Sequence, residues 1–131
     1  KTRQLPTFIY ETQKFVLVLK IKIEVSSDKL EGYNLFFDLQ NFKLSPENIE
    51  IKNDGNSGYL QLFINDIKIS RIYSSWFHAP ERFFNQKRNS IKVKLFTNLH
   101  DELTIDNQPI EFKLKFQNKI FFYVALYGKD E

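Results

Sequence analysis

Residues 58–66 read GYLQLFIND and contain the pattern that decides the fold of this chain. The apolar run Leu60 to Ile64 ends at Asn65-Asp66, two residues that tolerate the left-handed backbone of a tight turn. An apolar run that ends in such a pair predicts one strand of a β-hairpin. Short runs bounded by turn residues recur along most of the chain.

Four further stretches carry apolar side chains at every second position, the period of a strand that buries one face, and in the first of them polar residues fill the other positions only from Lys20 onward. Their apolar positions are Phe15, Leu17, Leu19, Ile21, Ile23 and Val25; Tyr33, Leu35, Phe37 and Leu39; Ile91, Val93 and Leu95; and Phe112, Leu114 and Phe116. No comparable stripe with helical period runs over a dozen positions. We therefore expect an all-β chain of about eight to ten short strands, folded as a two-sheet sandwich, immunoglobulin-like or cupredoxin-like.

The chain of 131 residues has the length of a single domain. We expect an N-terminal arm or edge strand over residues 1–14 and the sandwich domain over residues 15–131. Ser45-Pro46-Glu47 predicts one short helical turn, because Ser accepts a backbone hydrogen bond and Pro suits the first helical position. Residues 78–89 form the longest irregular connection.

Composition excludes several classes of protein. The chain has no Cys, hence no disulfide and no thiolate chemistry. Its formal net charge of +3 permits contact with polyanions without demanding it. Apolar runs such as Phe15 to Leu19 are far shorter than the roughly 20 residues of a membrane helix, so we expect no membrane span.

Several short motifs appear in order between about residues 32 and 112. They are Gly32-Tyr33-Asn34-Leu35, the run NFKLSPEN at 41–48, Lys68, Arg71 and Tyr73, Trp76-Phe77-His78, Asn98-Leu99-His100, and Pro109-Ile110. In this order they resemble a family of small exported bacterial β-sandwich domains. The resemblance implies a sandwich fold and a periplasmic or secreted location.

The sequence departs from that family at one informative place. Where the family pattern has two histidines separated by one residue, this chain has Tyr59 and Gln61. Alternate positions on a strand point to one face, which is a natural arrangement for metal ligands. Neither Tyr nor Gln replaces histidine well as a ligand of copper or zinc. A metal site implied by the resemblance is therefore largely lost here.

His78 and His100 are the only histidines. A copper or zinc site using both needs further ligands, because such sites have three or four; Asp101, Glu102 or Tyr59 are the candidates. The structural alternative is that each imidazole donates a hydrogen bond to the backbone and packs against an aromatic ring. We expect the structural role and keep the metal site as an alternative.

Trp76, the only tryptophan, lies between Tyr73 and Phe77. These rings are candidates for a platform that binds a sugar, an acyl chain or another protein. A lone Trp in a β domain more often packs inside the core, and burial is what we expect for Trp76.

Lysines alternate on three predicted strands, as Lys20/Lys22, Lys92/Lys94 and Lys113/Lys115. If these strands were adjacent, the lysines would form a basic stripe on which Phe36 or Phe96 stacks the bases of a single-stranded nucleic acid. The alternative is a solvated face that protects edge strands from pairing. We expect the solvated face.

The sequence has no nucleophile elbow, no glycine-rich phosphate loop and no zinc-protease motif, so we expect no enzyme and no cofactor. We expect a non-catalytic, extracytoplasmic binding or accessory module that contacts another protein or a small ligand through its rim loops. Its candidate binding residues are Tyr59, Gln61, Tyr73, Trp76, Phe77 and His78. The alternatives are a residual copper or zinc protein using His78 and His100, and a weak binder of single-stranded nucleic acid.

Overall fold

The computed structural model describes residues 2–4, 20–45, 57–105, 108–117, 120–126 and 129–130. Their elements are β1 Thr2–Gln4, β2 Lys20–Ser27, β3 Tyr33–Gln40, β4 Lys43–Leu44, β5 Ser57–Ile64, β6 Ile67–Ile72, β7 Trp76–Ala79, the 3-10 turn η3 Glu81–Phe83, β8 Arg88–Thr97, β9 Glu102–Ile105, β10 Gln108–Pro109, β11 Glu111–Gln117, β12 Ile120–Leu126 and β13 Lys129–Asp130. The predicted all-β fold is confirmed.

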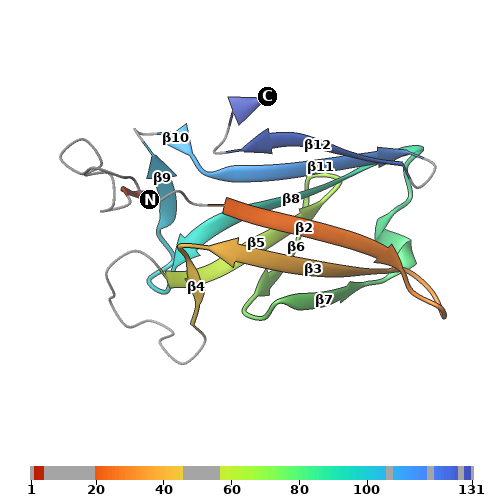
Figure 1. Ribbon diagram of the computed structural model, residues 1–131, viewed down its shortest axis with the longest axis horizontal. Helices are drawn as coiled ribbons and strands as arrows, with labels where there is room; N and C mark the ends of the chain where they lie inside the picture. The colour runs from red at the N-terminus through yellow and green to blue at the C-terminus, as the bar shows by residue number, and fades with distance from the viewer. Residues whose placement is uncertain are drawn as a thin grey trace.

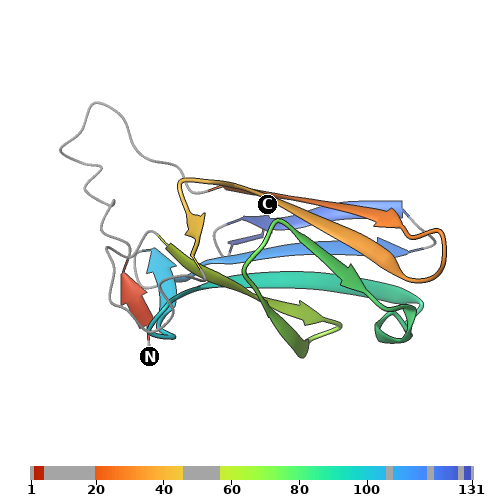
Figure 2. The same ribbon diagram turned by 90° about the horizontal axis from the view of Figure 1, so that it is seen from below.

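The strands form two sheets that face each other (Figures 1 and 2). The large sheet runs β1-β9-β8-β11-β12-β13, with β5 on the other edge of β8; β4 and β6 flank β5, and β10 joins β9. The small sheet is β2-β3-β7. The predicted two-sheet sandwich is confirmed, with more strands than expected because β1, β4, β10 and β13 are too short to leave an alternating pattern.

The core fills the space between the sheets with the predicted parities. The small sheet contributes Ile21, Ile23, Leu35 and Phe37, and the large sheet contributes Leu60, Leu62, Ile64, Ile91, Val93, Leu95, Phe112, Leu114 and Phe116. Each such side chain stabilises the fold by roughly 1.5–3 kcal/mol relative to an exposed one. The polar residues between them point to the two outer faces.

The turn that follows β5 has the predicted form. Asn65 and Asp66 have φ values of 53° and 65°, and Ile64 pairs with Ile67, so this is a two-residue hairpin with both central residues left-handed. The helical turn predicted at Ser45-Pro46-Glu47 falls mostly outside the described residues. The 3-10 turn η3 instead lies in the connection expected to be irregular.

At the chain's start, β1 pairs in parallel with β9 at an edge of the large sheet. Residues 5–19, which include the apolar run from Phe15 to Leu19, lie outside the described part. Where the structure describes the chain, it contains no helix long and apolar enough to cross a membrane.

Candidate functional site

Four predicted site residues meet on the outer face of the large sheet. Strand β5 turns Tyr59 and Gln61 outward, beside Phe96 of β8 and Arg71 of β6. Tyr73 follows β6, and His100 lies in the β8–β9 turn. We call Tyr59, Tyr73, Phe96, His100 and Arg71 the tyrosine cluster, because Tyr59 contacts each of the others.

Tyr59 is the centre of this cluster. Its hydroxyl lies 3.0 Å from Nδ1 of His100, its ring stacks on Phe96 with centroids 5.5 Å apart, and the Arg71 guanidinium lies 5.2 Å from its centroid. Only 4% of Tyr59 is exposed. Burial raises the pKa of the Tyr59 hydroxyl, and the positive charge of Arg71 partly opposes this rise. Tyr59 is therefore a neutral packing residue on an outer face.

The backbone of His100 is unusual. Its φ of 69° lies in the left-handed region, and its N–H donates to the Thr97 carbonyl at 2.9 Å. Glycine is the residue that adopts this conformation without strain. The His100 side chain offsets part of that strain through its contact with the Tyr59 hydroxyl.

Gln61 and Tyr73 face the same side but have different surroundings. Gln61 is almost fully buried, and its Nε2 donates to the Ser70 carbonyl at 2.9 Å. The Tyr73 hydroxyl is buried without a hydrogen-bond partner in the described part of the chain. We expected Tyr59 and Gln61 to lie in a rim loop. Instead they lie on β5, which pairs with β6 and β8, and neighbouring side chains cover them.

The other predicted site residues belong to β7, at an edge of the small sheet. Phe77 packs against the core, whereas Trp76 and His78 point outward. Trp76 is 51% exposed, and Phe36, its partner on β3, is 44% exposed. We call Trp76 and Phe36 the aromatic platform. The expected burial of Trp76 is wrong, because this position of β7 points to the outer face of the small sheet, as Phe36 does on β3.

Asn34 fixes the orientation of Trp76. Its Oδ1 accepts from Nε1 of Trp76 at 3.3 Å and lies 3.2 Å from Nδ1 of His78. Its Nδ2 donates to Asp28 at 3.0 Å, which decides which end of the amide carries the oxygen. The indole is therefore exposed but held in one direction.

His78 ties the β2–β3 turn to β7 and η3. Its Nε2 lies 3.0 Å from Oε1 of Glu31, whose other oxygen accepts from the Glu81 backbone N–H at 3.1 Å. Asn34 Oδ1 and Glu31 Oε1 therefore lie within hydrogen-bond distance of the two ring nitrogens of His78. The hydrogen bond from His78 holds the pKa of Glu31 below its usual value, and the Leu30 backbone N–H and Asn34 amide do the same for Asp28.

The structure does not bring the two histidines together. His78 contacts residues of the small sheet, and His100 contacts Tyr59 of the large sheet. In Figures 1 and 2 the β8–β9 turn lies at one end of the molecule, and β7 runs toward η3 at the other. Over the described ranges, no group of three or more His, Cys, Asp or Glu side chains is placed to hold a metal ion.

The basic stripe considered as an alternative would cover only two adjacent strands, β8 and β11. Lys113 of β11 pairs with Lys92 of β8, whereas Lys22 lies on the small sheet. Lys92 Nζ lies 3.5 Å from Asp66 and 3.4 Å from Glu111, and Lys94 Nζ lies 3.5 Å from Glu102. Carboxylates of the same chain thus engage both β8 lysines.

No family model matches this sequence, and no curated protein and no solved structure matches it either. The fold and its faces define the class: an all-β sandwich domain with a cluster centred on the buried Tyr59 on one outer face and an aromatic platform on the other. The sequence interpretation missed Asn34 and Glu31 as partners of His78. The exposure of Phe36 could have been predicted, since it is a large apolar residue at the outward-facing position between Leu35 and Phe37.

Proposed function

We propose that this protein is a non-catalytic binding module that holds a carbohydrate on the aromatic platform, working outside the cytoplasm as the resemblance implies. The observation that supports this is the state of Trp76, which is 51% exposed and at the same time fixed by the Asn34 amide. A ring held at the surface in one orientation is prepared for contact with a flat partner.

The two rings of the platform share one row of the small sheet. Phe36 lies between Trp76 of β7 and Glu24 of β2. The next rows on either side carry Lys22 with Asp38, and Asn34 with His78. Two apolar surfaces are thereby surrounded by charged and polar groups on an open sheet face.

This surrounding favours a sugar ring over the other partners. A sugar presents an apolar C–H face with hydroxyl groups around it, and therefore matches apolar rings bordered by carboxylates and an amide. The core of a protein interface is depleted of charged residues, unlike the rows around Phe36. An acyl chain gains most from enclosure, whereas this platform is open.

The single tryptophan makes a direct test possible, because all indole fluorescence comes from Trp76. We expect a panel of soluble oligosaccharides to include one that shifts the emission to shorter wavelength with a saturable dependence on concentration. Phe36→Ala is expected to weaken that binding by roughly tenfold, which corresponds to about 1.4 kcal/mol. Leu30→Ala is the matched control, because Leu30 is 94% exposed and lies off the platform.

An unchanged emission with every oligosaccharide, together with unretarded migration in gels containing polysaccharides, contradicts the carbohydrate proposal. Equal weakening by Phe36→Ala and Leu30→Ala places the binding surface elsewhere. Emission that shifts only with added protein partners assigns the platform to protein recognition instead.

A further inference from the structure

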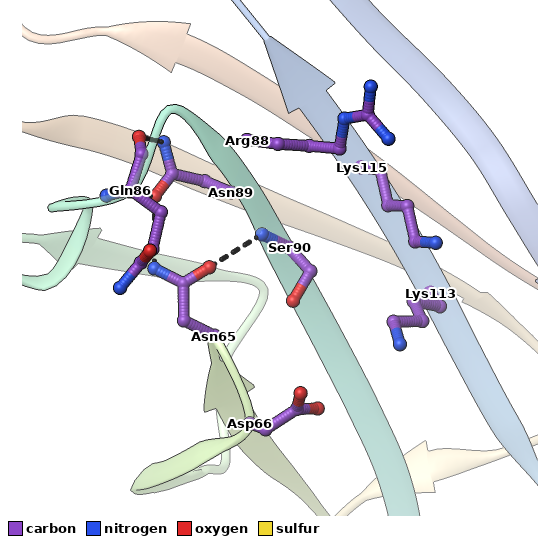
Figure 3. Close-up of a pocket in the computed structure, with 8 residues that line it drawn as sticks. All are labelled: Asn65, Asp66, Gln86, Arg88, Asn89, Ser90, Lys113 and Lys115. Atoms are coloured by element: carbon purple, nitrogen blue, oxygen red, sulfur yellow. Dashed lines mark hydrogen bonds between the residues drawn. The ribbon is translucent and has the colours of Figure 1, made fainter.

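A hollow of about 340 Å³ opens where the Asn65-Asp66 turn meets the start of β8 and the outer face of β11. Its cationic lining consists of Arg88, Lys113 and Lys115, and Asp66 is the one carboxylate among the lining residues. Figure 3 shows Lys113 and Lys115 together on β11, with Asn65, Asn89 and Gln86 on the other side of β8. This hollow belongs to the large sheet and is independent of the aromatic platform.

The amide side of the hollow is a rigid frame. Asn65 Nδ2 donates to Asn89 Oδ1 at 2.9 Å, and Asn65 Oδ1 accepts from the Ser90 N–H at 2.9 Å. Asn89, only 8% exposed, also donates to the Gln86 carbonyl at 3.0 Å. These bonds join the β5–β6 turn to the chain entering β8. The frame therefore fixes the shape of the hollow while its own polar groups are already in use.

The cations are less fully compensated than the other lysines of this face. Asp66 is drawn toward Lys92, whose Nζ lies 3.5 Å from its carboxylate. In the described ranges, no carboxylate lies within 4.0 Å of Lys113 or Lys115, and Arg88 donates to the neutral Gln117 at 3.4 Å. Lys113 and Lys115 share one face of β11, so they stand roughly 7 Å apart at the strand's rise per residue. Their mutual repulsion favours an anion between them.

We propose that this hollow binds the phosphate group of a phosphorylated ligand. A phosphate monoester carries roughly −1.5 to −2 charges at neutral pH, enough to meet several cations, whereas a carboxylate or a sulfate ester brings a single charge. The Arg88 guanidinium supplies the planar fork that suits phosphate oxygens, and the two lysines act as point charges. The strands and the frame hold these groups before the ligand arrives.

Inorganic pyrophosphate is the probe for this site. We expect it to raise the thermal midpoint of the protein in a saturable manner at an ionic strength of about 0.1 M, where distant charges are screened. The double substitution Lys113→Gln and Lys115→Gln is expected to weaken pyrophosphate binding by at least tenfold, the effect of about 1.4 kcal/mol. The control is Lys68→Gln, which removes one positive charge, against two in the double variant, from an exposed lysine of β6 and is expected to leave binding nearly unchanged.

Three results overturn the proposal: no midpoint change with millimolar pyrophosphate, the same weakening in Lys68→Gln, or an equal effect of a singly charged sulfate ester such as methyl sulfate. If the double variant is unfolded without ligand, Arg88→Gln replaces it, because Arg88 is exposed and its loss leaves the β11 face intact. Pyrophosphate is expected to leave the Trp76 emission unchanged, because Trp76 does not line the hollow. The phosphate proposal and the carbohydrate proposal can therefore fail independently.

Discussion

The two outer faces of the sandwich differ in how far their aromatic side chains are exposed to solvent. Tyr59 on the large sheet is 4% exposed, whereas Trp76 on the small sheet is 51% exposed. Tyr59 lies on β5, which has β6 on one edge and β8 on the other, and the β8–β9 turn brings His100 against it. Trp76 lies on β7, which pairs only with β3 in the described chain. Phe36 is 44% exposed although β3 pairs on both edges. Covering side chains such as Phe96, Arg71 and His100, more than strand position, therefore decide that Tyr59 is buried.

The largest effect expected from this comparison is on stability. Tyr59→Ala should lower the free energy of unfolding by about 3 kcal/mol or more, since it leaves a cavity among the contacting rings. Trp76→Ala should change it by only about 0.5 kcal/mol. Tyr59→Phe, which removes only the hydroxyl bound to His100, should cost about 1 kcal/mol. Urea unfolding of the three variants checks the order, and equal costs at the two positions would refute the contrast.

Gly32 offers the next largest effect, on the small sheet. Its φ is +76°, and an added Cβ would lie 2.4 Å from the Ala79 carbonyl oxygen. Gly32→Ala should therefore lower the free energy of unfolding by about 2 kcal/mol or more, of which left-handed strain supplies roughly 1–2. Leu30→Ala in the same turn is the control and should be nearly neutral. A mild effect of Gly32→Ala would mean that the turn detaches from β7 at little cost.

Substitutions of His100 test how much its contact with the Tyr59 hydroxyl stabilises the tyrosine cluster. His100→Ala loses the contact with Tyr59 and keeps a left-handed backbone, so we expect a loss of about 1 kcal/mol. His100→Gly loses the same contact and relieves the strain, and should be more stable than the Ala variant by about 1 kcal/mol. Denaturation midpoints compare the pair. If Ala is the more stable of the two, the turn has another conformation.

The smallest expected effect is a loss of stability at acid pH from the hydrogen-bonded carboxylates near His78, Asp28 and Glu31. The pKa values of Asp28 and Glu31 lie below their ordinary values of 3.8 and 4.5. A carboxyl with a lowered folded pKa stabilises the fold above its unfolded pKa, and this contribution disappears as pH falls through the folded pKa. Unfolding free energy should thus fall as pH drops below the ordinary values, with a shallower slope in Glu31→Gln. Urea titrations over that acid range measure the unfolding free energy at each pH. An identical slope in Glu31→Gln would argue that the Glu31 carboxylate does not stabilise the fold.

Periodicity predicted the parts of the fold that depend on local sequence. Ile91, Val93 and Leu95 face inward as their alternation requires, and Asn65-Asp66 forms the tight hairpin. Edge strands such as β4 and β10 were not predicted, because two residues are too few to show the alternation of a strand. Their pairing depends on long-range register.

The candidate site was harder to predict, because its residues meet only through strand order. Tyr59 and His100 are far apart in sequence, and the pairing of β5 with β8 brings them together. The exposure of Trp76 depends on which face of the small sheet it occupies and on what covers that face, and the four residues of β7 show no alternation that reveals it. Lys113 and Lys115 were recognised as a pair, but Arg88 joins them only through the β8–β11 register.

Strand β8 lies between two neighbours that come from distant parts of the chain. Its residues pair with β5 on one edge and with β11 on the other. Since neither pairing is a simple hairpin, long loops must close before this ladder forms, and such topologies fold slowly. Once formed, the amide hydrogens of β8 should exchange with solvent only when the whole domain opens, so their exchange rates give the global stability.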